Sequence, residues 1–121
     1  MIFRDNDHKE RFEKIMQRMK QNSPYHRSAA YLMALANMPA DEVFNFTFGC
    51  IRHEGLFAPW QTSSSRHATR LMFNLWNGCH QDHASDDPDA SSGYYAVDEI
   101  FSNREYAPWF YEAVRIRFEM D

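Results

Sequence analysis

Hydroxyl and basic side chains gather in the middle of the chain, where the sequence predicts that a helix begins. Residues 60–66 read Trp-Gln-Thr-Ser-Ser-Ser-Arg, and Arg70 follows one helical turn later. The N-terminus of a helix carries a partial positive charge, so acidic residues would stabilise this position and two cations do not. The pattern therefore indicates a negatively charged partner, either a bound anion or a carboxylate.

The helix that follows places its polar residues in one row. Arg66, Arg70 and Asn74 are each four residues apart, and Asn77 lies close to the same row. Free N–H groups at a helix start, hydroxyls and a planar guanidinium together suit a phosphate or a carboxylate, and a tryptophan can stack on a ring. We therefore predict a ligand-binding site made of Trp60, Gln61, Thr62, Ser63, Ser64, Ser65, Arg66, Arg70, Asn74, Trp76 and Asn77.

The same residues also have a purely structural explanation. One hydroxyl of the 62–64 run is expected to be the N-cap of the helix, an interaction worth about 1 kcal/mol. Arg70 would then pair with an acid at the edge of the core, such as Glu54 or Glu99. The choice between the two explanations depends on whether the polar row faces a cleft or an internal salt bridge.

Two cysteine–histidine pairs offer the ligand types of a zinc site. Cys50 and His53 have the spacing C-x2-H, and Cys79 and His83 have the spacing C-x3-H; a tetrahedral zinc ion accepts two thiolates and two imidazoles. A whole predicted helix separates the pairs, however, and a domain of this size does not need a metal ion to fold. We expect no metal and no other cofactor, with Cys50 buried and with His80 and His83 exposed.

No other motif indicates a reaction. The acidic residues between 82 and 89 lack the spacing and the closing glutamate of a calcium loop. The sequence has no glycine-rich phosphate loop, dinucleotide-binding fingerprint or nucleophile elbow. Nucleophilic catalysis would need a cysteine–histidine pair or Ser64 with His67, and no third residue can be assigned to either. A binding protein is therefore favoured over an enzyme.

Length and composition define the class of protein. The 121 residues predict one domain, residues 1–121, and two cysteines fit the reducing cytoplasm. The formal net charge of −4 and the lack of a basic run argue against non-specific nucleic-acid binding. No apolar stretch approaches the roughly 20 residues of a membrane span. Aromatic residues make up 16% of the chain, so they either line a pocket or an interface or fill gaps between short helices.

Apolar periodicity and capping signals predict an all-α fold of five to six short helices in one compact bundle. An ordered loop at 49–62, which turns Ile51, Leu56 and Phe57 inward, and an acidic, solvated loop at 79–93 interrupt the helices. The segment 41–48 is ambiguous between helix and extended chain, and a helix is favoured. The expected helices are 5–21, 24–36, 41–48, 63–77, 94–102 and 106–118.

Three blocks of the sequence carry a family resemblance. They are the opening with Phe3 and His8, the stretch from Glu54 to Gly78, and the ending from Tyr106 to Arg117. These blocks resemble a family of small uncharacterised proteins from Gram-positive gut bacteria and from their phages and mobile elements. The resemblance implies a single helical domain and a phage or mobile-element setting, and it implies no activity. Neither the cysteine–histidine pairs nor the length of the 79–93 loop belongs to that pattern.

These observations predict a small cytoplasmic binding protein that counteracts host defence. It would sequester an anionic, nucleotide-like small molecule or occlude a host protein. It would not bind membranes, and it would not bind nucleic acid non-specifically. An alternative is a nucleotide-directed hydrolase or transferase in the same cleft, with Glu54, His53 or His67 as the base. Another is an assembly protein whose exposed aromatic residues form the interface of a homo-oligomer.

Overall fold

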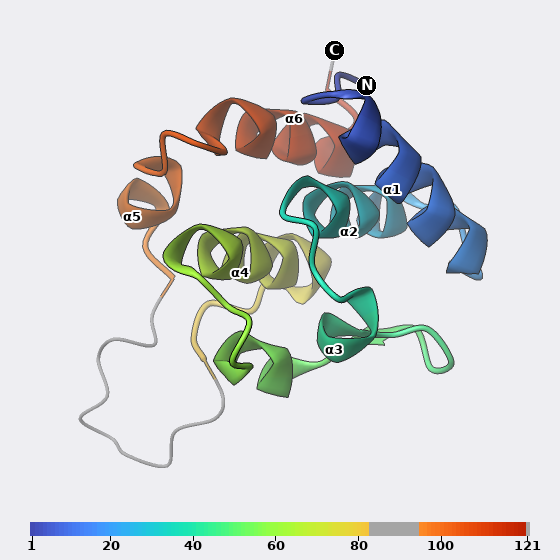
Figure 1. Ribbon diagram of the computed structural model, residues 1–121, viewed down its shortest axis with the longest axis horizontal. Helices are drawn as coiled ribbons and strands as arrows, with labels where there is room; N and C mark the ends of the chain where they lie inside the picture. The colour runs from blue at the N-terminus through green and yellow to red at the C-terminus, as the bar shows by residue number, and fades with distance from the viewer. Residues whose placement is uncertain (83–94, 121) are drawn as a thin grey trace.

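The computed structural model describes residues 1–82 and 95–120, which form a bundle of helices with one small hairpin (Figure 1). The predicted all-α class is confirmed. The elements in order are α1 (Asn6–Arg18), α2 (Pro24–Leu35), α3 (Ala40–Val43), β1 (Phe44–Asn45), β2 (Cys50–Ile51), the 3-10 helix η1 (His53–Phe57), α4 (Ser63–Asn77), α5 (Val97–Phe101) and α6 (Ala107–Phe118).

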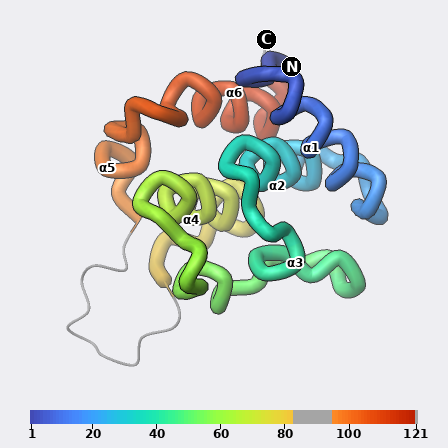
Figure 2. Tube along the Cα trace, in the orientation of Figure 1, coloured from blue at the N-terminus to red at the C-terminus, as the bar shows by residue number. Residues whose placement is uncertain are grey.

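Helix α2 lies at the centre of the bundle and contacts α1, α4 and α6 (Figures 1 and 2). All its residues from Ser28 to Leu35 are buried. A helix that is apolar on every side must be covered on every side, and its alanines allow the neighbouring helices to approach closely. In the described part of the chain, no helix is long and apolar enough to cross a membrane.

The caps confirm the predicted starts of α1, α2 and α4 and the predicted end of α4. The side chains of Asp5, Ser23 and Thr62 cap α1, α2 and α4, and each accepts a hydrogen bond from a backbone N–H three residues later. Gly78 ends α4 in the left-handed conformation, with φ of 78°. A glycine adopts this conformation without the steric cost that a Cβ atom imposes.

The segment 41–48 is not one helix, and this part of the prediction is wrong. Helix α3 ends at Val43, and the chain continues into a hairpin in which Phe44 pairs with Ile51. The side-chain oxygen of Asn45 accepts hydrogen bonds from the N–H groups of residues 47 and 48, which stabilises a turn instead of a helix. Gly49, with φ of 69°, completes that turn.

Two further expectations about the loops and helix ends are corrected. Helix α1 ends at Arg18, because the next residue is extended, and does not continue to residue 21. In the 49–62 segment, Ile51 and Leu56 are buried as expected, but Phe57 is 52% exposed. The 3-10 helix directs Gly55 and Leu56 into the core and leaves the ring of Phe57 on the outside.

Candidate functional site

The hydroxyls at the start of α4 hydrogen-bond to one another and to the preceding loop. Thr62 and Ser65 form a reciprocal capping box, in which each side-chain oxygen accepts from the other residue's N–H at 3.1 and 2.7 Å. Ser65 Oγ also donates to Gln61 Oε1 at 2.6 Å. Gln61 Nε2 donates to the Gly55 carbonyl and to Thr69 Oγ1. These polar groups therefore join η1 to α4, as the structural explanation required.

A carboxylate also lies beside this helix start. Ser64 Oγ donates to Glu105 Oε2 at 3.2 Å, so Ser64 is bonded to this acid and not to His67. Arg66 directs its Nε–H to the Leu56 carbonyl at 3.2 Å. The negative charge of Glu105 opposes an incoming anion at this end of α4.

Arg70 forms a buried ion pair with Asp82, and not with Glu54 or Glu99. The distance from Nη2 to Oδ2 is 3.0 Å, and the two side chains are only 13% and 7% exposed. Asp82 was expected in a solvated loop, and that expectation is wrong for this residue. Among residues 1–82 and 95–120, the buried atoms Arg70 Nε and Asp82 Oδ1 have no hydrogen-bond partner. The pair is therefore part of the protein's interior, next to the partly buried ring of Tyr95.

Tyr95 and Cys79 complete the cluster around this ion pair. Burial raises the pKa of the Tyr95 phenol, and the neighbouring Cys79 and Asp82 raise it further. The Tyr95 backbone N–H donates to the His80 carbonyl at 3.0 Å. The described residues on either side of the 83–94 segment, His80 and Tyr95, thus lie together beside α4, while Asp86, Asp87, Asp89 and His83 lie outside the described residues.

The far end of the polar row fixes the chain that leaves α4. Asn74 Nδ2 donates to the Cys79 carbonyl at 3.1 Å, and Asn77 Oδ1 accepts from the Cys79 N–H at 3.0 Å. A helix of this length spans about 22 Å. Trp60 precedes its start and Trp76 lies in its last turn, so the two rings do not share one small cleft.

The cysteine–histidine pairs are arranged differently from the expectation. Cys50 is exposed on the hairpin and Cys79 is buried, so the expected burial of Cys50 is wrong, whereas His80 is exposed as expected. Among residues 1–82 and 95–120, no three histidine, cysteine or acidic side chains are placed to hold a metal ion.

The candidate base His67 has a neighbour at each ring nitrogen. Asn103 Nδ2 lies 3.2 Å from its Nδ1, and Glu99 Oε1 lies 4.0 Å from its Nε2. Burial lowers the pKa of His67, and Arg70 and Arg66 add to this effect. Glu54 is exposed and lies 3.8 Å from Arg52. His67 and Glu54 therefore each have neighbours within the protein.

Sequence reasoning missed a pocket at the opposite end of α4. It has a volume of about 310 Å³ and lies between the residues that follow α1, the start of α2, the hairpin and the last turn of α4. We call it the aromatic pocket. Its lining residues are Met19, Lys20, Gln21, His26, Phe44, Phe46, Phe48, Gly49 and Trp76.

The walls of the aromatic pocket are rings packed edge to face. Trp76 contacts Phe44 at 5.2 Å between centroids and His26 at 5.0 Å, and Phe44 contacts Phe46 at 5.0 Å. This geometry is the one aromatic pairs prefer, because the positive edge of one ring meets the negative face of another. The phenylalanines at 44, 46 and 48 were the signal in the sequence, although only Phe44 lies in strand β1 and the other two lie in the turn that follows it.

The rim of the aromatic pocket carries the positive charge of Lys20, and Arg18 lies next to it. Lys20 Nζ donates to the Thr47 carbonyl at 2.7 Å, and the Arg18 guanidinium lies 3.9 Å from the centroid of Phe46. Asp41 is close by, but Arg18 hydrogen-bonds it and thereby lowers its pKa. Phe48, at the tip of the hairpin, is 81% exposed.

Aromatic residues continue beyond the pocket along the surface. Tyr25 lies edge to face with Trp76 at 6.4 Å, and the Arg117 guanidinium lies 3.6 Å from the centroid of Tyr25. Phe118, which is 57% exposed, flanks the same guanidinium at 4.7 Å. The pocket, Tyr25, Arg117 and Phe118 together form what we call the aromatic surface.

Comparison with known proteins gives one match. The sequence profile of a family of unknown function, DUF6075, matches residues 1–121. The chain belongs to this family. The resemblance to an uncharacterised family is thus confirmed over the whole chain. No curated protein and no solved structure matches it.

Proposed function

We propose that this protein is a small binding protein that occludes another protein, and that the aromatic pocket is its contact site. The observation that supports this most directly is the combination of ring walls, a basic rim and the exposed Phe48 in one hollow. Aromatic residues and arginine are enriched where protein interfaces derive most of their binding energy.

The pocket suits an apolar side chain better than a nucleotide. Its walls are mainly phenylalanine, tryptophan and methionine, with Lys20, Gln21 and His26 as the polar residues. A nucleotide would need several hydrogen-bond partners for its base and its phosphates, because polar groups that lose water without a new partner weaken binding. A large apolar side chain of a partner has no such requirement.

The charge of the rim indicates the surroundings of that side chain. Lys20 lies at the pocket with a positive charge, His26 beside it is neutral near pH 7 because burial lowers its pKa, and Arg117 lies further along the aromatic surface. Complementary charges favour a partner segment in which aspartate or glutamate flanks the apolar anchor. In a phage or mobile-element setting, covering such a segment on a host defence protein would block that protein.

Selection from a displayed library of random short peptides, followed by affinity measurement on the selected peptides, tests the proposal. We expect peptides with one large apolar residue between acidic residues. Phe48→Ser and Lys20→Glu should each weaken binding by about tenfold, which corresponds to about 1.4 kcal/mol. Phe57→Ser is the matched control, because this ring is also exposed but lies on η1, outside the pocket.

Three outcomes would contradict the proposal. The first is a selection in which Phe48→Ser enriches the same peptides as the unmodified protein. The second is a thermal shift produced by nucleotides and removed by Lys20→Glu, which would favour the anionic small molecule instead. The third is self-association, measured by light scattering, that Phe48→Ser abolishes, since a second copy would then occupy the pocket.

A further inference from the structure

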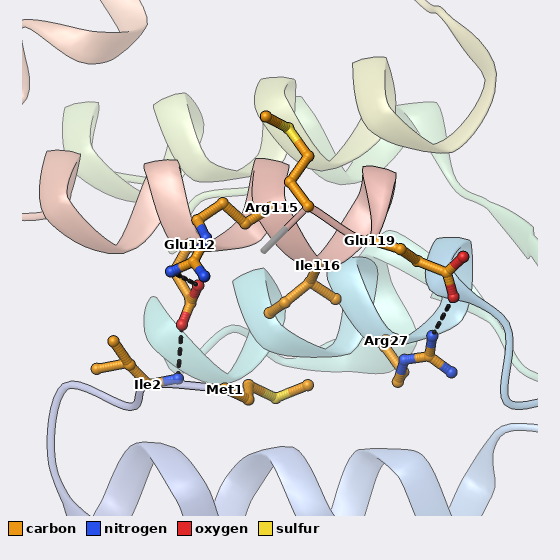
Figure 3. A pocket seen from close by; sticks show the side chains of 8 residues that line it. Met1, Ile2, Arg27, Glu112, Arg115, Ile116 and Glu119 are labelled. Atoms are coloured by element: carbon orange, nitrogen blue, oxygen red, sulfur yellow. Dashed lines mark hydrogen bonds and ion pairs between the residues drawn. The ribbon is translucent and has the colours of Figure 1, made fainter.

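Residues 1–4 form a strap before α1, and side chains from three different helices hydrogen-bond to its backbone. The Ile2 N–H donates to Glu112 Oε2 of α6 at 2.7 Å (Figure 3), and the hydroxyl of Tyr31 on α2 donates to the Ile2 carbonyl. The Arg4 N–H donates to Nδ1 of His8 on α1 at 3.0 Å. One of the three side chains that bind this backbone is a histidine, the residue type that titrates closest to neutral pH.

His8 is fixed as the neutral imidazole by its two hydrogen bonds. Its Nδ1 accepts from a backbone N–H and therefore carries no proton. Its Nε2 lies 3.0 Å from the Tyr31 carbonyl and must be the protonated nitrogen. The side chain is fully buried, so a second proton on the ring would have neither water nor an acceptor at Nδ1.

The charges around His8 come from the strap and from each helix packed against it. Burial is the main reason why its pKa is lowered, and Arg11 and Arg4 lower it further; the hydrogen bond to the Tyr31 carbonyl and the charge of Asp5 oppose them. Helix α2 contributes Tyr31, whose ring centroid lies 4.5 Å from that of His8, and α6 contributes Glu112 next to Tyr31. The two arginines outnumber the single aspartate, and a proton on His8 adds a like charge to them.

We propose that His8 is an acid-sensitive latch for the strap. When Nδ1 takes up a proton, it can no longer accept from the Arg4 N–H, and the buried imidazolium favours the state in which the strap leaves the helices. Phe3, whose ring packs edge to face on His8 at 5.1 Å, leaves with it.

Release of the strap uncovers a hollow between α2 and α6. This hollow, of about 420 Å³, is covered on one side by Met1 and Ile2 (Figure 3). The Glu112 carboxylate then loses the hydrogen bond from the Ile2 N–H, but it remains paired with the Arg115 guanidinium, which lies 3.2 Å away. The latch thus couples pH to the exposure of a surface that contains Ile116 and the ion pair of Arg27 with Glu119.

Linkage gives the expected size of the effect. If one proton binds on opening, the equilibrium constant for strap opening rises by as much as tenfold per pH unit. The rise begins near pH 6.5, about the pKa of a histidine in water, and ends at the lowered pKa of the closed state. The hydrogen exchange of the Arg4 N–H reports this constant, once intrinsic rates are corrected for pH.

Hydrogen exchange followed by nuclear magnetic resonance from about pH 7.5 to 5 is the test. We expect the protection of the Arg4 N–H to fall with pH and to stay below that of Met72, in the core of α4, whose exchange reports unfolding of the whole domain. His8→Asn retains an acceptor near Nδ1 and does not titrate, so its Arg4 protection should be independent of pH. Constant protection in the unmodified protein, an equal fall in His8→Asn, or loss of all helices together would overturn the latch.

A reciprocal measurement keeps the proposal testable if His8→Asn does not fold. Ile2→Pro removes the backbone N–H that donates a hydrogen bond to Glu112. Ile2 itself is 63% exposed. A weakened strap must raise the pKa of His8 toward its value in water, because coupling between two sites is mutual. His80→Gln, which changes an exposed histidine, should leave the His8 titration unchanged. An unaltered pKa of His8 in Ile2→Pro would show that the strap and the imidazole are not coupled.

Discussion

The two ends of α4 differ in what their side chains contact. At the start of the helix, Thr62, Ser65 and Arg66 form hydrogen bonds within the protein. At its last turn, Trp76 forms the wall of a hollow whose rim includes the exposed ring of Phe48. Polar groups that the protein already satisfies have little left to offer a ligand, whereas exposed rings next to a pocket still have surface to bury.

The largest effect is expected from breaking the ion pair beside α4. Asp82→Ala leaves the Arg70 guanidinium buried without its partner, and such a change typically destabilises a protein by about 3 kcal/mol. The double variant Arg70→Met with Asp82→Leu should recover most of this loss, since no buried charge remains. Urea denaturation measures both. If Asp82→Ala lowers the free energy of unfolding by less than about 0.5 kcal/mol, the ion pair is not part of the interior as described, and Arg70 is available to a ligand.

A smaller effect is expected from removing the cap of α4. Thr62→Ala deletes the acceptor for the Ser65 N–H and should lower the free energy of unfolding by about 1 kcal/mol. Ser63→Ala, next to it, changes an exposed hydroxyl and should be close to neutral. If the two variants lost the same free energy of unfolding in thermal or urea denaturation, the assignment of Thr62 as the cap would be contradicted.

At the aromatic pocket, pH should change affinity more than it changes the fold. Burial lowers the pKa of His26, so the ring is neutral near pH 7, and a bound acidic segment would raise that pKa. Binding then takes up a proton, and affinity for an acidic peptide should rise a few-fold as the pH falls from about 7.5 to 6. In His26→Gln this dependence should disappear. A pH-independent affinity in the unmodified protein would remove His26 from the contact.

The smallest effect concerns the stability of the hairpin tip. Phe48→Ser exchanges an 81% exposed ring, so the free energy of unfolding should change by less than about 0.5 kcal/mol. Trp76→Ala, in contrast, removes a ring that packs on Phe44 and His26 and should cost more than 1 kcal/mol. Similar losses in the two variants would mean that Phe48 supports the fold and is not free for a partner.

Local signals in the sequence were sufficient for the helical framework. Ser23 before Pro24, the hydroxyl at residue 62 and Gly78 are the caps of α2 and α4, because capping depends on a few neighbouring residues. The apolar row of α4 could also be predicted from the sequence, since its period is a property of the helix itself. The hairpin could not be predicted in the same way, because Phe44, Phe46 and Phe48 alternate over too few residues to distinguish a strand from a short helix.

The sequence by itself determined the all-α class, the main helices and the inward face of α4. Only the tertiary structure decided which polar residues were left for function. Arg70 forms an ion pair with Asp82, twelve residues further along the chain, and Trp76 packs against rings from the hairpin and from α2. Caps and amphipathic rows are set by residues within one or two turns. A pocket is set by elements distant in sequence, whose packing no local pattern specifies.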